Sequence, residues 1–432
     1  MHRSEVPGRG VIRHRGRVLL MILAVTVCVV AAVLSGVRSG GVMSQPEVPD
    51  PSDRPHLSSP VLGELGTMKA VGPDVSRPLD GLDRDAGLSA VLSDGSVLWL
   101  FGDTARKTPS GGLEFFVIGT AAWAPAEDPT TTQEYLADGE PVTLAEPTQS
   151  FPKCPVEAPV AGMWPASVVV LPEGGADRVL VWLANVCLGE GGVLVTRGMA
   201  VGEWWYDPEQ PPGSYPIQVA ILEQNLFPPR DADADVAVFG AASLLGNDGL
   251  IYAYSCRTVG ELGKDSGENC YAARVAPEGA TDVETYAVWN GERFTPDRRA
   301  AAPMEMPTGP GGKPIPPGQL SVAWHAGISA YVMVYSPWPG WSDAVHIRIA
   351  DNPWGPWSKP TSLPLSGCAD VVGGRTYNCY TANRQVLMDA PGVLGVGYYD
   401  SRIDPDEGPS GAFVVAGVPI ELDRRVADRD RD

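Results

Sequence analysis

Short apolar segments recur along the chain, and each of them follows a turn that contains glycine. The five segments that carry aromatic residues are VLWLFG (97–102), VLVWLAN (179–185), LIYAYS (250–255), AYVMVYS (330–336) and LGVGYYD (394–400). Their first residues lie 82, 71, 80 and 64 positions apart. A shorter apolar segment precedes each turn, as NRQVLM (383–388) does in the last unit. Two extended segments joined by a tight turn form a hairpin, so the pattern predicts five β-hairpins.

A further apolar segment follows most of these hairpins, and no long stretch shows a helical period. The additional segments are FFVIGTAAW (115–123), VLVTRGMAV (193–201), AVHIRIAD (344–351) and AFVVAGVPI (412–420). Units of roughly 70–80 residues with up to four strands are typical of β-propeller blades. The sequence therefore predicts an all-β, five-bladed β-propeller over residues 66–421. Stacked β-sandwiches are the alternative, but they would not require so regular a spacing.

The N-terminal segment has a different pattern. Residues 18–37 contain no charge and are just long enough to span a bilayer as a helix, and the segment 1–17 before them is rich in arginine. This pattern predicts a single transmembrane anchor behind a basic cytoplasmic segment, with a cleaved signal peptide as the alternative. Both alternatives predict an extracytoplasmic body, at the cell membrane or secreted. Residues 38–65 are expected to form a flexible linker, and residues 422–432 a disordered charged tail.

Cysteine usage agrees with an exported protein. Six cysteines lie outside the N-terminal apolar run, and an even number in an exported domain indicates disulfides. Pairing each cysteine with its neighbour predicts three bridges: Cys154–Cys187, Cys256–Cys270 and Cys368–Cys379. Other pairings stay open at this point. A zinc site is disfavoured because the sequence contains no C-x-x-C and only 5 histidines.

Composition narrows the function classes. With 44% hydrophobic residues the chain is not largely disordered, and its 50 glycines and 42 prolines fit a protein rich in turns. The formal net charge is −20, while arginines crowd the first 17 residues, so the body is strongly acidic. An acidic body argues against nucleic-acid binding and against anionic glycans. No metal or cofactor motif is present, and we expect a monomer without cofactors.

Propeller geometry indicates where chemistry would lie. The first strand of each blade lines the central channel, so the residues just before it lie at one mouth. Those positions include Asp85, Trp164, Asp235 and Tyr380. Carboxylates and aromatic rings that converge on a funnel are typical of a carbohydrate site. For Asp235 a solvated loop is the alternative.

One segment resembles a known family. The sequence GLDRDAGLSAVLSDGSVLWLFGDT (81–104) contains an R-D-x-G-x-S stretch, a D-G turn and a strand ending in W-x-F-G-D-T. It resembles five-bladed propeller glycoside hydrolases of the bacterial endo-D-arabinanase type. The resemblance implies cleavage of arabinofuranosyl linkages by a pair of aspartates, which fall on Asp85 and Asp103. It also makes Arg84 a candidate for substrate binding. The segment YNCYTANRQVLM (377–388) departs from related propellers, which often carry a histidine there.

The two aspartates make chemical sense without the resemblance. Asp85 precedes the first strand of its hairpin and Asp103 ends the second, at similar distances from the turn at 93–96, so their carboxyl groups should meet. A glycosidase needs one carboxyl group as acid and another as base or nucleophile. Which residue has which role stays open, and the alternative is that both merely cap strand ends. Asp400 matches Asp103 in the repeat register, which makes Asp400 and Arg402 further candidates.

These observations lead to one main expectation. We expect an extracytoplasmic glycoside hydrolase that acts on arabinofuranosyl linkages, endo-acting on the D-arabinan of a cell envelope. The alternatives are a carbohydrate-binding propeller without catalysis and a propeller scaffold for cell-envelope proteins.

Overall fold

The computed structural model describes most of the chain after residue 56. The described residues are 57–73, 82–108, 113–190, 193–210, 215–229, 237–256, 270–307, 317–337, 342–365, 368, 371–372, 375–376, 379–404 and 410–422. Contacts place Pro55–Asp432 in one compact unit. No helix among the described residues is long and apolar enough to cross a membrane. The predicted anchor (18–37) and the tail beyond Leu422 lie outside the described residues.

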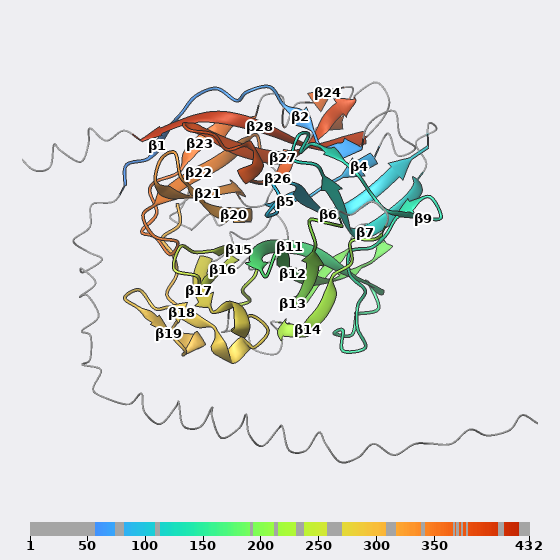
Figure 1. Ribbon diagram of the computed structural model, residues 1–432, viewed down its shortest axis with the longest axis horizontal. Helices are drawn as coiled ribbons and strands as arrows, with labels where there is room; N and C mark the ends of the chain where they lie inside the picture. The colour runs from blue at the N-terminus through green and yellow to red at the C-terminus, as the bar shows by residue number, and fades with distance from the viewer. Residues whose placement is uncertain are drawn as a thin grey trace, which may run out of the picture. The chain divides into compact units, whose positions relative to one another are not determined.

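Most of the strands form five antiparallel sheets, which are the blades of a five-bladed β-propeller (Figure 1). Blade one contains β4 (Leu82–Arg84), β5 (Leu88–Val91), β6 (Val97–Lys107) and β7 (Leu113–Ala124). Blade two contains β11 (Val160–Glu173), β12 (Ala176–Leu188), β13 (Leu194–Tyr206) and β14 (Ala220–Phe227). Blade three contains β15 (Ala242–Leu245), β16 (Ile251–Cys256), β17 (Cys270–Val275), β18 (Ala287–Trp289) and β19 (Phe294–Thr295). Blade four contains β20 (Pro317–His325), β21 (Ala330–Pro337), β22 (Ala344–Ala350) and β23 (Thr361–Pro364).

Blade five joins the two ends of the propeller. It contains β26 (Cys379–Arg384), β27 (Val393–Asp404) and β28 (Ser410–Leu422), and its outer edge is formed by β1 (Pro60–Leu62) and β2 (Lys69–Ala70). In Figure 1 the blue N-terminal strand β1 lies beside the red C-terminal strand β28. The remaining short strands are β3 (Gly72–Pro73), β8 (Thr131–Thr132), β9 (Leu136–Ala137), β10 (Glu140–Pro141), β24 (Val371–Val372) and β25 (Arg375–Thr376). The single-turn 3₁₀ helices are η3 (Pro277–Gly279), η4 (Val283–Thr285), η5 (Arg298–Ala300) and η7 (Val386–Met388).

The first strands of the blades surround the central channel. Strand β11 contacts β5 and β15, and β20 contacts β15 and β26. The helix η7, which follows β26, contacts β5 and so closes a ring around the centre of Figure 1. One serine per blade lines the channel in blades one to four: Ser89, Ser167, Ser243 and Ser321. The cavity that these strands enclose has a volume of about 280 Å³. Small side chains suit this position because the inner strands converge there.

The core consists of interfaces between blades. Five clusters of buried hydrophobic side chains are found among the described residues, and each combines residues from two neighbouring blades. Trp182 of blade two, for example, packs with Phe239 of blade three, and Trp99 of blade one packs with Phe413 of blade five. A blade is apolar on both faces and cannot bury them alone, so the ring is stable only when it is complete.

The structure confirms the five predicted hairpins and corrects two boundaries. The predicted strand at 383–388 ends at Arg384, and η7 follows it, because the chain turns at Gln385 and Val386 to reach β27. The propeller also begins earlier than residue 66. Strand β1 pairs with β28, so Pro60–Leu62 belongs to blade five rather than to a flexible linker. This three-residue strand has no strong local pattern, and its partner is more than 300 residues away.

All three predicted disulfides are present. They join Cys154 to Cys187, Cys256 to Cys270 and Cys368 to Cys379. The middle bridge joins directly opposite residues of β16 and β17. The other two fasten connecting segments to strands β12 and β26.

Candidate active site

Asp85 lies at an interruption of the innermost strand of blade one. Strands β4 and β5 both pair with β6, and Asp85, Ala86 and Gly87 separate them. The Asp85 backbone still bonds to β6, since its N–H donates to the carbonyl of Asp103 (3.3 Å) and its carbonyl accepts from Gly102 N–H (3.1 Å). Ala86 has a φ of +52°, a left-handed conformation that costs a non-glycine residue roughly 1 kcal/mol. Strain of this kind is often found at functional sites.

Asp103 lies on β6 directly beside Asp85. Oδ1 of Asp85 accepts a hydrogen bond of 2.9 Å from the backbone N–H of Asp103. This approach requires a glycine at position 102, because a Cβ there would lie 2.8 Å from Oδ1 of Asp85. The geometry therefore brings together the two carboxylates that the hairpin register predicts to meet.

Two aromatic residues from neighbouring blades complete the cluster. The indole N–H of Trp164 on β11 donates to Oδ1 of Asp103 (2.8 Å), and the hydroxyl of Tyr380 on β26 donates to Oδ2 of Asp85 (2.9 Å). Both residues lie next to a register shift in their strand. Such irregularities re-aim side chains beside active sites. Four of the predicted site residues, from blades one, two and five, thus converge at one end of the channel.

Burial and mutual repulsion perturb both carboxyl groups. Burial raises the pKa of Asp85, against the lowering effects of the hydrogen bonds from the Asp103 backbone and Tyr380. Burial, with the charge of Asp85 added to it, raises the pKa of Asp103 from its usual 3.8 to about 7. The two groups titrate as a coupled pair that holds a proton near neutral pH.

The hydrogen bonds indicate where that proton resides. Both oxygens of Asp85 accept hydrogen bonds, one from Asp103 and one from Tyr380, and donors to both oxygens favour the carboxylate. Among the described residues, the Asp103 side chain receives one hydrogen bond, from Trp164 at Oδ1. We therefore assign the charge to Asp85 and the proton to Asp103. One ionised and one protonated carboxyl group side by side can perform acid/base chemistry.

A second tyrosine–aspartate pair lies behind the first, and the sequence reasoning missed it. The hydroxyl of Tyr399 on β27 donates to Oδ1 of Asp83 (2.8 Å), and the rings of Tyr399 and Tyr380 lie 4.7 Å apart. The charge of Asp83 adds to the rise in the pKa of Asp85. The sequence contains one sign of this pair. Asp83 and Asp85 lie two residues apart, so their side chains point to the same side, and blade five offers two tyrosines, Tyr380 and Tyr399.

Two further predicted site residues, Arg84 and Asp400, are buried. Arg84 is only 2% exposed; it pairs with the buried Glu134 at 2.7 Å and covers the ring of Phe101. Its side chain points to the face of the sheet opposite that of Asp85, because neighbouring residues of a strand point to opposite faces, and these contacts give it a structural role in blade one. Asp400 is buried on β27 opposite Cys379. Asp235 and the side chain of Arg402 lie outside the described residues.

Removing the hydroxyl of Tyr380 should shift the pH dependence of any reaction at this site. Tyr380→Phe deletes a donor that stabilises the Asp85 carboxylate, so the pKa of Asp85 should rise further. The acidic limb of the pH profile of kcat/KM should then move to higher pH, by about 1 unit. Tyr252→Phe is the matched control, because this hydroxyl bonds Asp248 in blade three. An unchanged acidic limb in Tyr380→Phe would contradict the assignment of the charge to Asp85.

The part of the chain that the structure describes contains no group of three or more His, Cys, Asp or Glu side chains arranged to hold a metal ion.

The protein is similar in fold to several proteins of known structure. No family model and no curated protein matches the sequence. A candidate hydrolase from Bacteroides ovatus aligns over 84% of this chain and 89% of its own, with 15% identity and a TM-score of 0.54. A GH43_1 enzyme from Xanthomonas citri aligns over 82% and 90%, with 14% identity and a TM-score of 0.42. An exo-1,5-α-L-arabinanase from a bovine ruminal metagenomic library aligns over 78% and 97%, with 9% identity and a TM-score of 0.42. At such identities the likeness concerns the fold alone, and the chain has the fold of a five-bladed β-propeller.

Proposed function

We propose that this protein is a glycoside hydrolase in which Asp103 is the general acid and Asp85 is its ionised partner. The observation that carries the proposal is the coupled carboxyl pair at the end of the channel. Asp103 has a pKa raised to about 7, so that about half of the molecules hold this proton at neutral pH, and a pKa near the working pH suits a general acid that protonates a leaving oxygen. Asp85, held ionised by two donors, would act as base or nucleophile.

The proposed substrate is a neutral polysaccharide with arabinofuranosyl linkages, cleaved internally, with D-arabinan as the first choice. Aromatic rings beside the carboxyl pair, from Trp164 and Tyr380, suit the apolar faces of sugars. The acidic body disfavours anionic glycans. The choice of D-arabinan rests on the resemblance of residues 81–104 to endo-D-arabinanases.

The proposed location is outside the cytoplasm, as a membrane-anchored or secreted monomer. Three disulfides support this location, because such bonds persist in oxidising compartments. The apolar run at 18–37 would supply the export signal or anchor.

The test is product analysis. The full-length protein is incubated with D-arabinan and, separately, with L-arabinan, and the products are separated by chromatography beside those of Asp85→Asn. We expect oligosaccharides from D-arabinan that are missing with the variant. If products form only from L-arabinan, the proposed substrate is wrong, but the proposed roles of Asp85 and Asp103 stand. No products from either polymer, with tight binding to one of them, would favour a carbohydrate-binding propeller without catalysis.

A further inference from the structure

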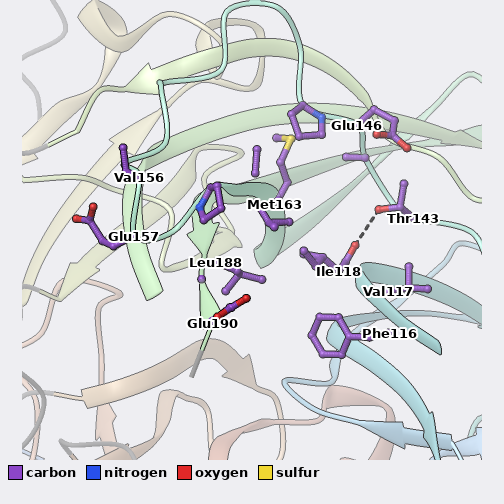
Figure 2. A pocket seen from close by; sticks show the side chains of 17 residues that line it. Phe116, Val117, Ile118, Thr143, Glu146, Val156, Glu157, Met163, Leu188 and Glu190 are labelled. Carbon is purple, nitrogen blue, oxygen red and sulfur yellow. Dashed lines mark hydrogen bonds between the residues drawn. The ribbon is translucent and has the colours of Figure 1, made fainter. Parts of the chain in front are cut away.

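A large groove lies between blades one and two, outside the carboxyl cluster (Figure 2). Strand β7 and the segment 143–147 form one wall, and the segment 156–163 with the end of β12 forms the other. Its volume of about 950 Å³ is at the upper end of the range of about 300–1,000 Å³ for ligand sites. We call this cavity the blade one–two groove.

Two residues that line the groove are direct neighbours of candidate active-site residues. Ile118 in its wall is the register partner of Asp103, so both side chains point to the same face of blade one, toward blade two. Met163 in the opposite wall directly precedes Trp164, which bonds Asp103. The two blades approach closely at Gly162, where a Cβ would lie 2.7 Å from the Ile118 side chain. The groove therefore lies beside Asp103 and Trp164, between the same two blades.

Its walls are held in place. The disulfide from Cys154 to Cys187 fastens the loop that carries Val156 and Glu157 to the end of β12. On the other side, the hydroxyl of Thr143 donates to the carbonyl of Ile118 (2.8 Å), the bond drawn in Figure 2. Fixed walls lower the entropic cost of ordering the protein when a ligand binds.

The lining combines apolar surface with hydrogen-bond acceptors. Phe116 is 47% exposed and Val160 is 53% exposed, and the three charged side chains are Glu146, Glu157 and Glu190. No lysine, arginine or histidine is among the described residues that line the groove. An exposed aromatic ring suits the C–H face of a sugar, and carboxylates accept hydrogen bonds from its hydroxyl groups. The negative charge disfavours an anionic ligand.

We infer that the blade one–two groove binds the stretch of neutral polysaccharide that adjoins the cleaved linkage, with Phe116 as its stacking platform. The inference rests on the proposed function and deepens it, because it makes polymer length a determinant of specificity. A long substrate occupies both the carboxyl cluster and the groove, whereas a short one occupies the cluster alone. Binding along the groove holds the chain for internal cleavage.

The test compares Phe116→Ala with Trp205→Ala in the full-length protein. Trp205 is 48% exposed at the opposite end of blade two, which makes it a matched control. For Phe116→Ala we expect KM for D-arabinan to rise about 5- to 10-fold, with kcat and the kcat/KM of a short arabino-oligosaccharide unchanged. Glu157→Gln should act in the same direction with a smaller effect, and Trp205→Ala should match the wild type.

The outcomes separate the groove from the catalytic proposal. If Phe116→Ala and Glu157→Gln hydrolyse D-arabinan with the wild-type KM, the groove does not bind the substrate, although the proposal of a glycoside hydrolase stands. If neither arabinan is hydrolysed, affinity electrophoresis in gels containing D-arabinan, L-arabinan or galactan provides the second readout. If one polysaccharide retards the wild-type protein, and Phe116→Ala weakens the retardation while Trp205→Ala does not, the groove binds that polysaccharide even though the protein does not hydrolyse it. Equal mobility of all variants in every gel would contradict the proposal that the groove binds a polysaccharide.

Discussion

Replacing Asp103 by Asn is expected to lower kcat by about 10²- to 10⁴-fold, the usual contribution of a general acid. Asparagine keeps the size of the side chain and can still accept the hydrogen bond from Trp164, so the geometry should persist. It cannot deliver a proton to the leaving oxygen. The measurement is the initial rate of reducing-end release, with Asp138→Asn as the control. Asp138 is an exposed residue of the turn between β9 and β10, in a left-handed conformation that asparagine tolerates.

The same variant should be more stable than the wild type, which separates loss of chemistry from loss of fold. The pKa of Asp103 in the folded protein, about 7, lies above its ordinary value of 3.8. The folded state therefore binds the proton more tightly, and stability is lost as the pH rises from about 4 to about 7. The asparagine side chain stays neutral at every pH, so the advantage of Asp103→Asn in unfolding free energy should grow over this range to about 2–4 kcal/mol. If Asp103→Asn keeps more than half of the wild-type rate of hydrolysis, Asp103 is not the general acid.

Deleting the closing strand is expected to give the largest loss of stability. Besides the β1–β28 pairing, Gly63 and Gly66 donate backbone hydrogen bonds to Pro419 and Gly417, each at 2.9 Å. Three leucines of this segment pack against the core between blades four and five: Leu57, Leu62 and Leu65. A fragment that starts at residue 67 loses all of these contacts, and we expect its unfolding free energy to fall by about 3–6 kcal/mol. Against typical stabilities of about 5–15 kcal/mol this is a large fraction.

The measurement is urea unfolding followed by tryptophan fluorescence. A fragment that starts at residue 55 is the control and should unfold at the same urea concentration as the full-length protein. Leu62→Ala in that fragment should lie between the two. Equal midpoints for the fragments starting at 55 and 67 would show that β1 does not contribute to closure.

The predictable parts of the fold and site are those encoded by nearby residues. Each hairpin joins segments a few residues apart, and the meeting of Asp85 with Asp103 follows from one hairpin register. Trp164 and Tyr380 could be placed because the start of every inner strand lies at the same mouth. These four positions need only local pairing and the propeller topology.

The features that could not be predicted depend on distant partners. The pairing of β1 with β28 and the burial of Arg84 against Glu134 are set by residues far along the chain. The pair of Tyr399 and Asp83 joins blades five and one across the closure. The blade one–two groove is assembled from segments between residues 116 and 190, and no single segment shows it. Short sequence patterns do not predict contacts between residues that lie far apart in the chain.

The most direct test of the central claim is hydrolysis of D-arabinan in water enriched in ¹⁸O, with mass spectrometry of the products. The account predicts new oligosaccharides with one ¹⁸O at each reducing end that cleavage creates, formed by the wild type and Asp138→Asn but not by Asp85→Asn or Asp103→Asn. Labelled products that persist at the wild-type rate in both of these variants would contradict it, as would the absence of any product from a folded wild-type protein.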